Sequence, residues 1–125
     1  AMRSLFSLNE TGHIINIAST VGEAGGAGVV SYGAAKAAVI NMTMSFAKEL
    51  APQIVVNAVS PGNINTDMTR GANEELIKQI LEKTPLKRLG EAQEVADLVV
   101  FLCSEKANFI TGQIIDIDGG YSCRT

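Results

Sequence analysis

The chain has 125 residues, 46% of them hydrophobic, and a formal net charge of −3. This length predicts one domain, and the composition excludes intrinsic disorder. With no basic cluster and no apolar run long enough for a bilayer, neither nucleic acid nor a membrane is an expected partner. The start of the chain carries no signal-peptide pattern, and its two cysteines suggest no disulfide framework. We therefore expect a cytoplasmic protein with Cys103 as a reduced thiol in the core.

The apolar patterns, taken in chain order, predict helices that alternate with strands. Loops rich in glycine or proline separate these elements, and an Asp-Gly-Gly turn follows the last strand. The predicted elements are the end of a helix over 1–8, a strand over 13–18, a helix over 31–51, a strand over 54–59, helices over 73–83 and 91–104, and a strand over 113–117.

Two of the predicted helices have a clear buried face. Ser31 is expected to cap the helix over 31–51, and Pro52 is expected to end it. The helix over 91–104 is expected to turn Val95, Leu98, Val99 and Leu102 inward. The buried stripe predicted for the longer helix consists of Ala35, Ala38, Val39, Met42, Phe46 and Leu50.

The order of these elements predicts the fold class. Mostly apolar strands separated by helices form parallel sheets covered on both faces, and right-handed crossovers lay such strands side by side. The sequence thus predicts an α/β fold with three parallel strands, one half of a doubly wound sheet. The strand over 13–18 would then have an unpaired edge, so we expect preceding sequence or a second polypeptide beside it.

The stretch after the first strand, residues 19–36, reads STVGEAGGAGVVSYGAAK and admits two interpretations. Gly22, Gly26 and Gly28 have the spacing of a phosphate-binding loop. Such a loop needs its glycines directly after the strand and a helix starting at the last one. Neither condition is met here, and the next strand does not end in an acidic residue. A flexible loop with close backbone approaches is the favoured interpretation.

The polar residues of the same stretch indicate a catalytic segment. Tyr32 and Lys36 are four positions apart in a helix and therefore share a face. An ammonium beside a phenol favours the phenolate, which can exchange a proton with substrate. Ser19 follows the carboxyl end of a parallel strand, where ligands bind in open α/β sheets. The alternative is that Tyr32 and Lys36 are an ordinary surface pair.

These residues and several later motifs resemble the short-chain dehydrogenase/reductase family. Asn16-Ile-Ala-Ser19, followed by Tyr32-x-x-x-Lys36, is similar to the family's active-site segment. The resemblance extends over nearly the whole chain. Its further motifs are Val56-Asn-Ala-Val-Ser-Pro-Gly62, Ile64-x-Thr66-Asp-Met68, Pro85-Leu-x-Arg88-Leu-Gly90, Glu94-Val-Ala96, and Thr111-Gly112 with Asp118-Gly-Gly120.

The resemblance implies a role for each site residue. Tyr32 is the general acid of carbonyl reduction, Ser19 orients the substrate carbonyl, and Lys36 holds the nicotinamide ribose of NAD or NADP. A mobile lid is implied from Thr66 to about Leu89, and residues 22–30 line the substrate mouth. Tyr32 and Lys36 are also implied to bind the cofactor, and the residues implied to border the nicotinamide are Pro61, Gly62, Ile64 and Thr66.

Family members run to about twice this length, so residues 1–125 resemble only the catalytic half of a Rossmann-type domain. The cofactor's glycine-rich loop, the residue that separates NAD from NADP, and a catalytic Asn belong to the other half. The pattern is most similar to 3-oxoacyl-thioester reductases of the acyl-carrier-protein type, which implies a homotetramer. Glu10 and Gln53 stand where those enzymes carry basic residues. A small alcohol, ketone or sugar therefore remains an alternative substrate. A second alternative is that the chain is a catalytically silent fragment that serves folding or oligomerisation.

The remaining polar residues give no second site. His13 is the single histidine and has no second ligand at metal spacing, so no metal is expected. Asp116 and Asp118 are not expected to form a carboxylate pair, and neither is Asp67. Phe101, Phe109 and Ile110 are interpreted either as a subunit contact or as core.

Overall fold

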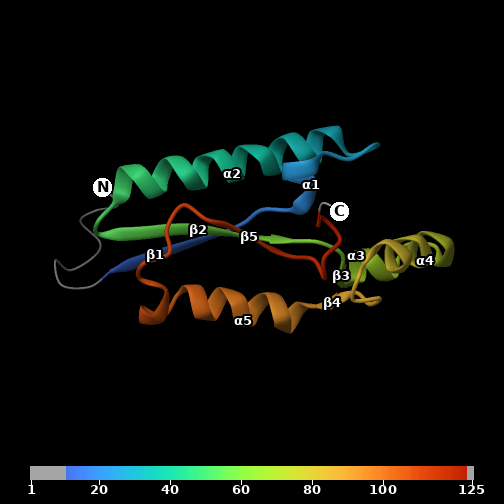
Figure 1. Cartoon of the computed structure of the whole chain (residues 1–125). Coiled ribbons are helices and arrows are strands. Elements are labelled where there is room, and N and C mark those ends of the chain that lie inside the picture. Colours follow the sequence, from blue (N-terminus) through green and yellow to red (C-terminus); the bar gives the residue numbers. More distant parts are fainter. Residues whose placement is uncertain (1–10, 124–125) are drawn as a thin grey trace.

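The computed structural model describes residues 11–123, apart from the side chains of Met68 and Arg70. The helix predicted over 1–8 lies outside this range. A parallel sheet forms the middle layer, in the order β1 (Gly12–Ile17), β2 (Ile54–Pro61), β5 (Ile114–Ile117). Helix α2 (Val30–Leu50) covers one face and α5 (Ala92–Leu102) covers the other (Figure 1). The predicted α/β fold with three parallel strands is confirmed.

The central strand β2 carries the core. Its residues from Ile54 to Ser60 are all buried, because helices lie on both faces and strands on both edges. Alternate side chains point to opposite faces. Ile54 and Val56 pack with Ala47 and Leu50 of α2. Val59 packs on the other face with Leu102 and Ala107, against which half-buried Val95, Leu98 and Val99 of α5 lie.

The buried face of α2 differs from the predicted stripe. Ala35, Ala38 and Met42 are exposed, and Thr43 is fully buried together with Ala47 and Leu50. Thr43 tolerates this position because its hydroxyl donates to the Val39 carbonyl at 2.8 Å and accepts from Asn16 Nδ2 at 2.9 Å. Leu50 is buried and Val39 and Phe46 are half-buried, so the predicted stripe is right at these three positions and wrong at Ala35, Ala38 and Met42. An apolar count misses Thr43 because it treats Thr as a surface residue.

Helix ends show two further differences. The cap expected at Ser31 is wrong, because α2 begins at Val30 after Val29, which makes no side-chain cap bond. Cys103 is exposed and not a core thiol. Helix α5 ends at Leu102, which is fully buried, and Cys103 lies one residue further round the helix axis, on the solvent side.

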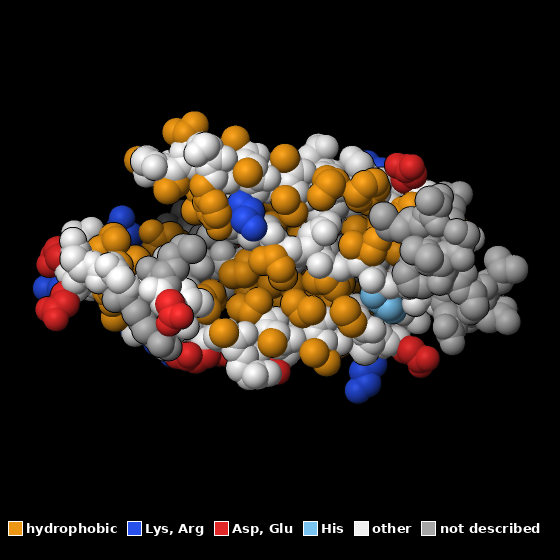
Figure 2. All heavy atoms as spheres, turned by 180° about the vertical axis from the view of Figure 1, so that it is seen from behind, with side chains coloured by type: hydrophobic (Ala, Val, Ile, Leu, Met, Phe, Trp, Pro, Cys, Tyr) orange, Lys and Arg blue, Asp and Glu red, His pale blue; other side chains and the backbone are white. Residues whose placement is uncertain are grey.

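The unpaired edge expected for the first strand is present among residues 11–123. In the sheet order β1 stands at one end and pairs with β2 alone, from Gly12 opposite Ile54 to Ile17 opposite Val59. Ile17 is 47% exposed. Figure 2 shows hydrophobic side chains gathered across the middle of the molecule, seen from behind the view of Figure 1. An exposed hydrophobic face beside an unpaired strand edge is usually buried against another part of a protein.

A smaller unit projects from the carboxyl end of the sheet (Figure 1). Two short parallel strands, β3 (Ile64–Asn65) and β4 (Gly90–Glu91), pair with each other. Between them lie helices α3 (Asp67–Arg70) and α4 (Glu74–Lys83). The chain therefore leaves the sheet after β2, makes a helical excursion and returns beside its point of departure.

Candidate active site

Ser19 is fixed at the carboxyl end of β1, where the sequence predicts it. The Ala18 amide still donates to the Val59 carbonyl at 2.8 Å, so the chain leaves the sheet directly before Ser19. Ser19 then caps the short helix α1 (Thr20–Ala24), and its Oγ accepts from the Val21 amide at 3.3 Å. Ser19 is buried, with 6% of the residue exposed. Helix α1 itself has no clear sequence signal, because its glycine obscures a helix this short.

Tyr32 and Lys36 come together on the first turns of α2. Lys36 Nζ lies 5.8 Å from the centre of the Tyr32 ring, within the range of a cation–π contact. The same ammonium donates to the Ile17 carbonyl at 2.9 Å. Lys36 thus joins the start of α2 to the end of β1, two residues before Ser19. Tyr32 is 47% exposed, so its phenol is open to a ligand.

Gly22 allows this arrangement. It lies inside α1, where a Cβ would stand 2.8 Å from the backbone carbon of Lys36. Contact this close requires glycine. Gly25 and Gly28 have positive φ angles of 74° and 79° and turn the chain back toward α2. A glycine within α1 does not have the geometry of a phosphate-binding loop, so the glycines serve the packing of α1 on α2.

The loop after β2 is held by backbone contacts. The Gly62 amide donates to the Ile117 carbonyl at 3.1 Å, and a Cβ on Gly62 would stand 2.5 Å from Cβ of Asp118. Ile64 lies in β3, and Thr66 caps α3 in a capping box with Thr69. The Thr69 hydroxyl also donates to the Ile64 carbonyl. Pro61, Gly62, Ile64 and Thr66 therefore form one ordered border that continues from the sheet.

A carboxylate outside the predicted site, Glu23, ties α1 to the sheet. Its Oε1 accepts from the fully buried Ser60 hydroxyl at 2.7 Å. Burial and the nearby Asp116 raise the pKa of Glu23, whereas Ser60 lowers it. Asp116 thus does have a carboxylate partner, contrary to expectation, because α1 brings Glu23 across to β5. The surrounding hollow is lined by Thr20, Glu23, Ala24, Asp116 and Ser122.

Replacing Glu23 by Gln is expected to stabilise the protein at neutral pH. The pKa of Glu23 is raised above its ordinary value of 4.5, so the folded state binds more protons there and stability falls as pH rises through that window. Gln keeps the acceptor for Ser60 and has no charge. The gain in urea denaturation should be present at pH 7 and vanish below about pH 4.5. Glu82→Gln, on the exposed side of α4, is the control; an equal gain in both variants would contradict the assignment.

The described part of the chain contains no cluster suited to a metal ion. Within residues 11–123, no group of three or more His, Cys, Asp or Glu side chains is placed to hold one. His13 Nδ1 is buried without a hydrogen-bond partner. In the same part of the chain no helix is both long and apolar enough to cross a membrane.

Fold and site together define a class: a doubly wound α/β protein with a Ser, a Tyr and a Lys at the carboxyl end of its sheet. A family model described as enoyl-(acyl carrier protein) reductase matches residues 1–122. The chain is 51% identical over 110 residues to the 3-oxoacyl-[acyl-carrier-protein] reductase FabG of Aquifex aeolicus, covering 87% of this chain and 44% of that protein. It is 50% identical over 111 residues to the same reductase of Staphylococcus epidermidis, and this match covers 88% of this chain and 46% of that protein.

Solved structures agree with these relatives. A short-chain dehydrogenase/reductase from Brucella melitensis superposes with a TM-score of 0.89 at 40% identity, covering 98% of this chain and 50% of that one. A 3-oxoacyl-[acyl-carrier protein] reductase from the same organism superposes with a TM-score of 0.84, also at 40% identity, and the match covers 87% of this chain and 41% of that one. The chain belongs to the short-chain dehydrogenase/reductase family. It spans less than half the length of the Aquifex and Staphylococcus relatives.

Proposed function

We propose that this chain is the catalytic half of an NAD(P)-dependent oxidoreductase that interconverts a 3-oxoacyl thioester and its 3-hydroxy form. One observation carries the proposal: Lys36 lies against the Tyr32 ring and donates to the carbonyl of Ile17 at the end of β1, two residues before Ser19. The similarity to 3-oxoacyl-[acyl-carrier-protein] reductases supports the substrate class. The complete enzyme is this chain joined to the preceding half that its relatives carry.

Each of the three polar side chains can take one part of the chemistry. The Tyr32 hydroxyl donates its proton to the substrate oxygen in reduction and takes it back in oxidation. The Lys36 ammonium lies close enough to stabilise the negative charge left on the phenol. Ser19 donates a hydrogen bond to the same substrate oxygen, since its hydroxyl proton is not used in the bond from Val21.

The residues present suit a nicotinamide nucleotide. Lys36 has three N–H donors, and the Ile17 carbonyl takes one, which leaves two for ribose hydroxyls. Pro61, Gly62, Ile64 and Thr66 form the ordered border along which the nicotinamide would lie. When bound, this group supplies the hydride. Because the residue that separates NAD from NADP belongs to the other half of family members, the proposal covers both.

The substrate proposal has a second candidate, a small alcohol, ketone or sugar. Of the two positions where the resemblance implies basic residues, Glu10 lies outside the described residues and Gln53 is half-buried and uncharged. An acidic carrier protein would find no cation at Gln53. The ratio of kcat/KM for a carrier-bound 3-oxoacyl thioester to that for a short free ketone decides between the candidates.

The direct test is consumption of reduced nicotinamide by the complete enzyme, followed by absorbance with a 3-oxoacyl thioester. Turnover that requires the thioester supports the proposal. Cofactor binding with no turnover on any carbonyl substrate would favour the alternative, a catalytically silent half that serves folding or oligomerisation. Titrating this chain alone with the cofactor shows how much affinity the preceding half supplies.

A homotetramer and a cytoplasmic location stay predictions. In support of a subunit contact, Phe101 is 42% and Phe109 105% exposed, near the end of α5 and after the short helix η2 (Glu105–Ala107). Ile110 instead packs partly buried against the core, as the alternative interpretation had it. We expect Phe109→Ser to shift the complete enzyme toward smaller species in sedimentation, because it removes exposed apolar area. Unchanged sedimentation would place the contact elsewhere.

A further inference from the structure

The helical excursion from residue 66 to residue 89 begins and ends at one place. β3 precedes it and β4 follows it, with Ile64 paired to Gly90 and Asn65 to Glu91. The Gly90 amide also donates to the Asn63 carbonyl at 3.0 Å. Whatever fixes β4 therefore also fixes β3, the strand that contains Ile64 and leads to Thr66.

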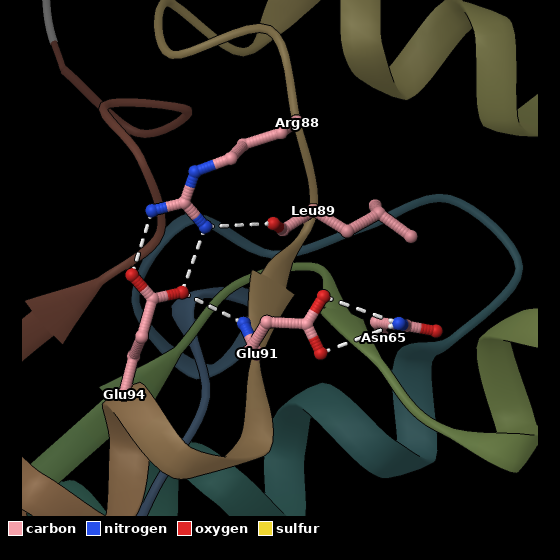
Figure 3. A network of polar contacts seen from close by, with 5 residues as sticks. All are labelled: Asn65, Arg88, Leu89, Glu91 and Glu94. Carbon is pink, nitrogen blue, oxygen red and sulfur yellow. Dashed lines mark hydrogen bonds and ion pairs between the residues drawn. The ribbon is translucent and has the colours of Figure 1, made fainter.

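An ion pair fixes β4 (Figure 3). Arg88 Nη1 donates to Glu94 Oε2 at 2.7 Å and Nη2 donates to Oε1 at 2.6 Å, a two-pronged geometry. Glu94 Oε2 accepts from the Glu91 amide at 2.8 Å, and Arg88 Nη1 donates to the Leu89 carbonyl at 3.1 Å. The pair thus connects the first turn of α5 with Glu91 in β4 and with Leu89, the residue before β4.

A second contact extends this network to β3. Asn65 Nδ2 donates to the two carboxylate oxygens of Glu91, at 3.2 and 3.3 Å. As Figure 3 shows, the chain of contacts runs from Arg88 through Glu94 and Glu91 to Asn65. The backbone pairing and the side-chain bonds therefore act on the same two strands.

The ion pair between Arg88 and Glu94 is better suited to position β4 than to stabilise the folded protein. Arg88 and Glu94 side chains are 52% and 41% exposed, and exposed ion pairs add little to the free energy of unfolding. The hydrogen bonds from Arg88, followed by the one from the Glu91 amide, lower the pKa of Glu94 to about 2. Glu94 is therefore ionised throughout the neutral range, and the pair is constant there.

Another anchor holds the C-terminal end of the excursion. Thr84 is buried, and the Leu86 amide donates to the Gly119 carbonyl at 3.2 Å. Loss of the Arg88–Glu94 pair would leave this anchor in place, so the excursion would stay attached to the sheet. The expected effect is therefore confined to β3 and β4.

We propose that Arg88 and Glu94 are positioning residues, whose ion pair locks β4 beside β3 and thereby sets the place of Ile64 and Thr66 in the cofactor border. This inference rests on the proposed function, in which that border holds the nicotinamide. Neither residue touches the reacting atoms. Their contribution is to the affinity for the cofactor and not to the proton transfer.

The kinetic test uses the complete enzyme. Arg88→Met should raise the KM for reduced nicotinamide about tenfold and change kcat less than about twofold, because misplacement of a binding border weakens binding. Arg88→Lys, which keeps the charge and one bond, should fall in between. Lys106→Met, which removes an exposed cation on η2, is the matched control. An unchanged KM in a folded Arg88→Met enzyme, or a loss in kcat alone, would overturn the proposal.

Hydrogen exchange separates this proposal from the proposed function. In Arg88→Met and in the milder Glu94→Gln, amides of residues 63–66 and 89–91 should exchange faster by about tenfold or more, while those of β2 stay unchanged. If the unmodified enzyme turned over no carbonyl substrate, the proposed function would fail, yet faster exchange would still support the locking of β3 and β4. Equal exchange in the variants and in Lys106→Met would refute it.

Discussion

Replacing Tyr32 by Phe is expected to lower turnover of the complete enzyme by about 10²- to 10⁴-fold, the usual contribution of a positioned general acid. Only the hydroxyl is lost, and the ring that lies against Lys36 remains. Folding and cofactor affinity should therefore stay close to those of the parent enzyme. Steady-state rates with saturating cofactor and substrate measure the effect.

The chain contains its own control for this substitution. It has two tyrosines, and Tyr121 lies 37% exposed in the turn after β5. Tyr121→Phe removes the same atom away from the Lys36 contact and should leave kcat within about twofold. If Tyr32→Phe kept most of the turnover, or if both variants lost it equally, Tyr32 would have no place in the mechanism.

Replacing Asn57 by Leu is expected to cost about 2 kcal/mol or more in the free energy of unfolding. Asn57 is fully buried in β2; its Nδ2 donates to the Ile110 carbonyl at 2.6 Å and its Oδ1 accepts from the Gln113 amide at 3.0 Å. Leu has a similar volume but leaves the Ile110 carbonyl and the Gln113 amide without a hydrogen-bond partner. Each of these groups destabilises the folded protein by about 1–3 kcal/mol if water cannot reach it.

Urea denaturation of the complete enzyme measures this loss. Asn108→Leu, at an exposed position after η2, is the matched control and should change stability by less than about 0.5 kcal/mol. A loss of the same size in both variants would show that Leu itself, and not the missing amide, is responsible. A stable Asn57→Leu protein would mean that water replaces both bonds.

The fold was predictable because its strands are strongly apolar and its helices periodic. The sequence predicts β2 over 54–59, and the strand continues to Pro61 because Ser60 and Pro61 pair with Asp116 and Ile117 of β5. Thr43 shows the limit of such patterns: a polar side chain becomes core when its hydroxyl is bonded inside the helix and to the neighbouring strand. A helical pattern is found from apolar residues alone, so it does not reveal that the Thr43 hydroxyl is hydrogen-bonded inside the protein.

The placement of the candidate site residues was predictable where spacing alone determines proximity. Tyr32 and Lys36 share a helix face at any tertiary arrangement, and the strand end fixes Ser19. Glu23 was not predictable, because its partners come from β2 and β5, 37 or more residues away in sequence. Arg88 and Glu94 lay within the motifs that resemble the family. Their pairing depends on the path of the chain through the short strand β4 (Gly90–Glu91) that lies between them, and no sequence pattern predicts this strand.

Hydride transfer assisted by Tyr32 is tested most directly by following the hydrogen itself. The complete enzyme is given a 3-oxoacyl thioester and reduced nicotinamide in which both hydrogens at C4 of the ring are deuterium, so that transfer from either face carries the label, and the mass of the product is measured by mass spectrometry. We expect a 3-hydroxyacyl thioester with one deuterium on the carbinol carbon, formed by the parent enzyme and by Tyr121→Phe and nearly lost in Tyr32→Phe. A 3-hydroxy product without deuterium, or equal labelling by all three proteins, would contradict the proposal.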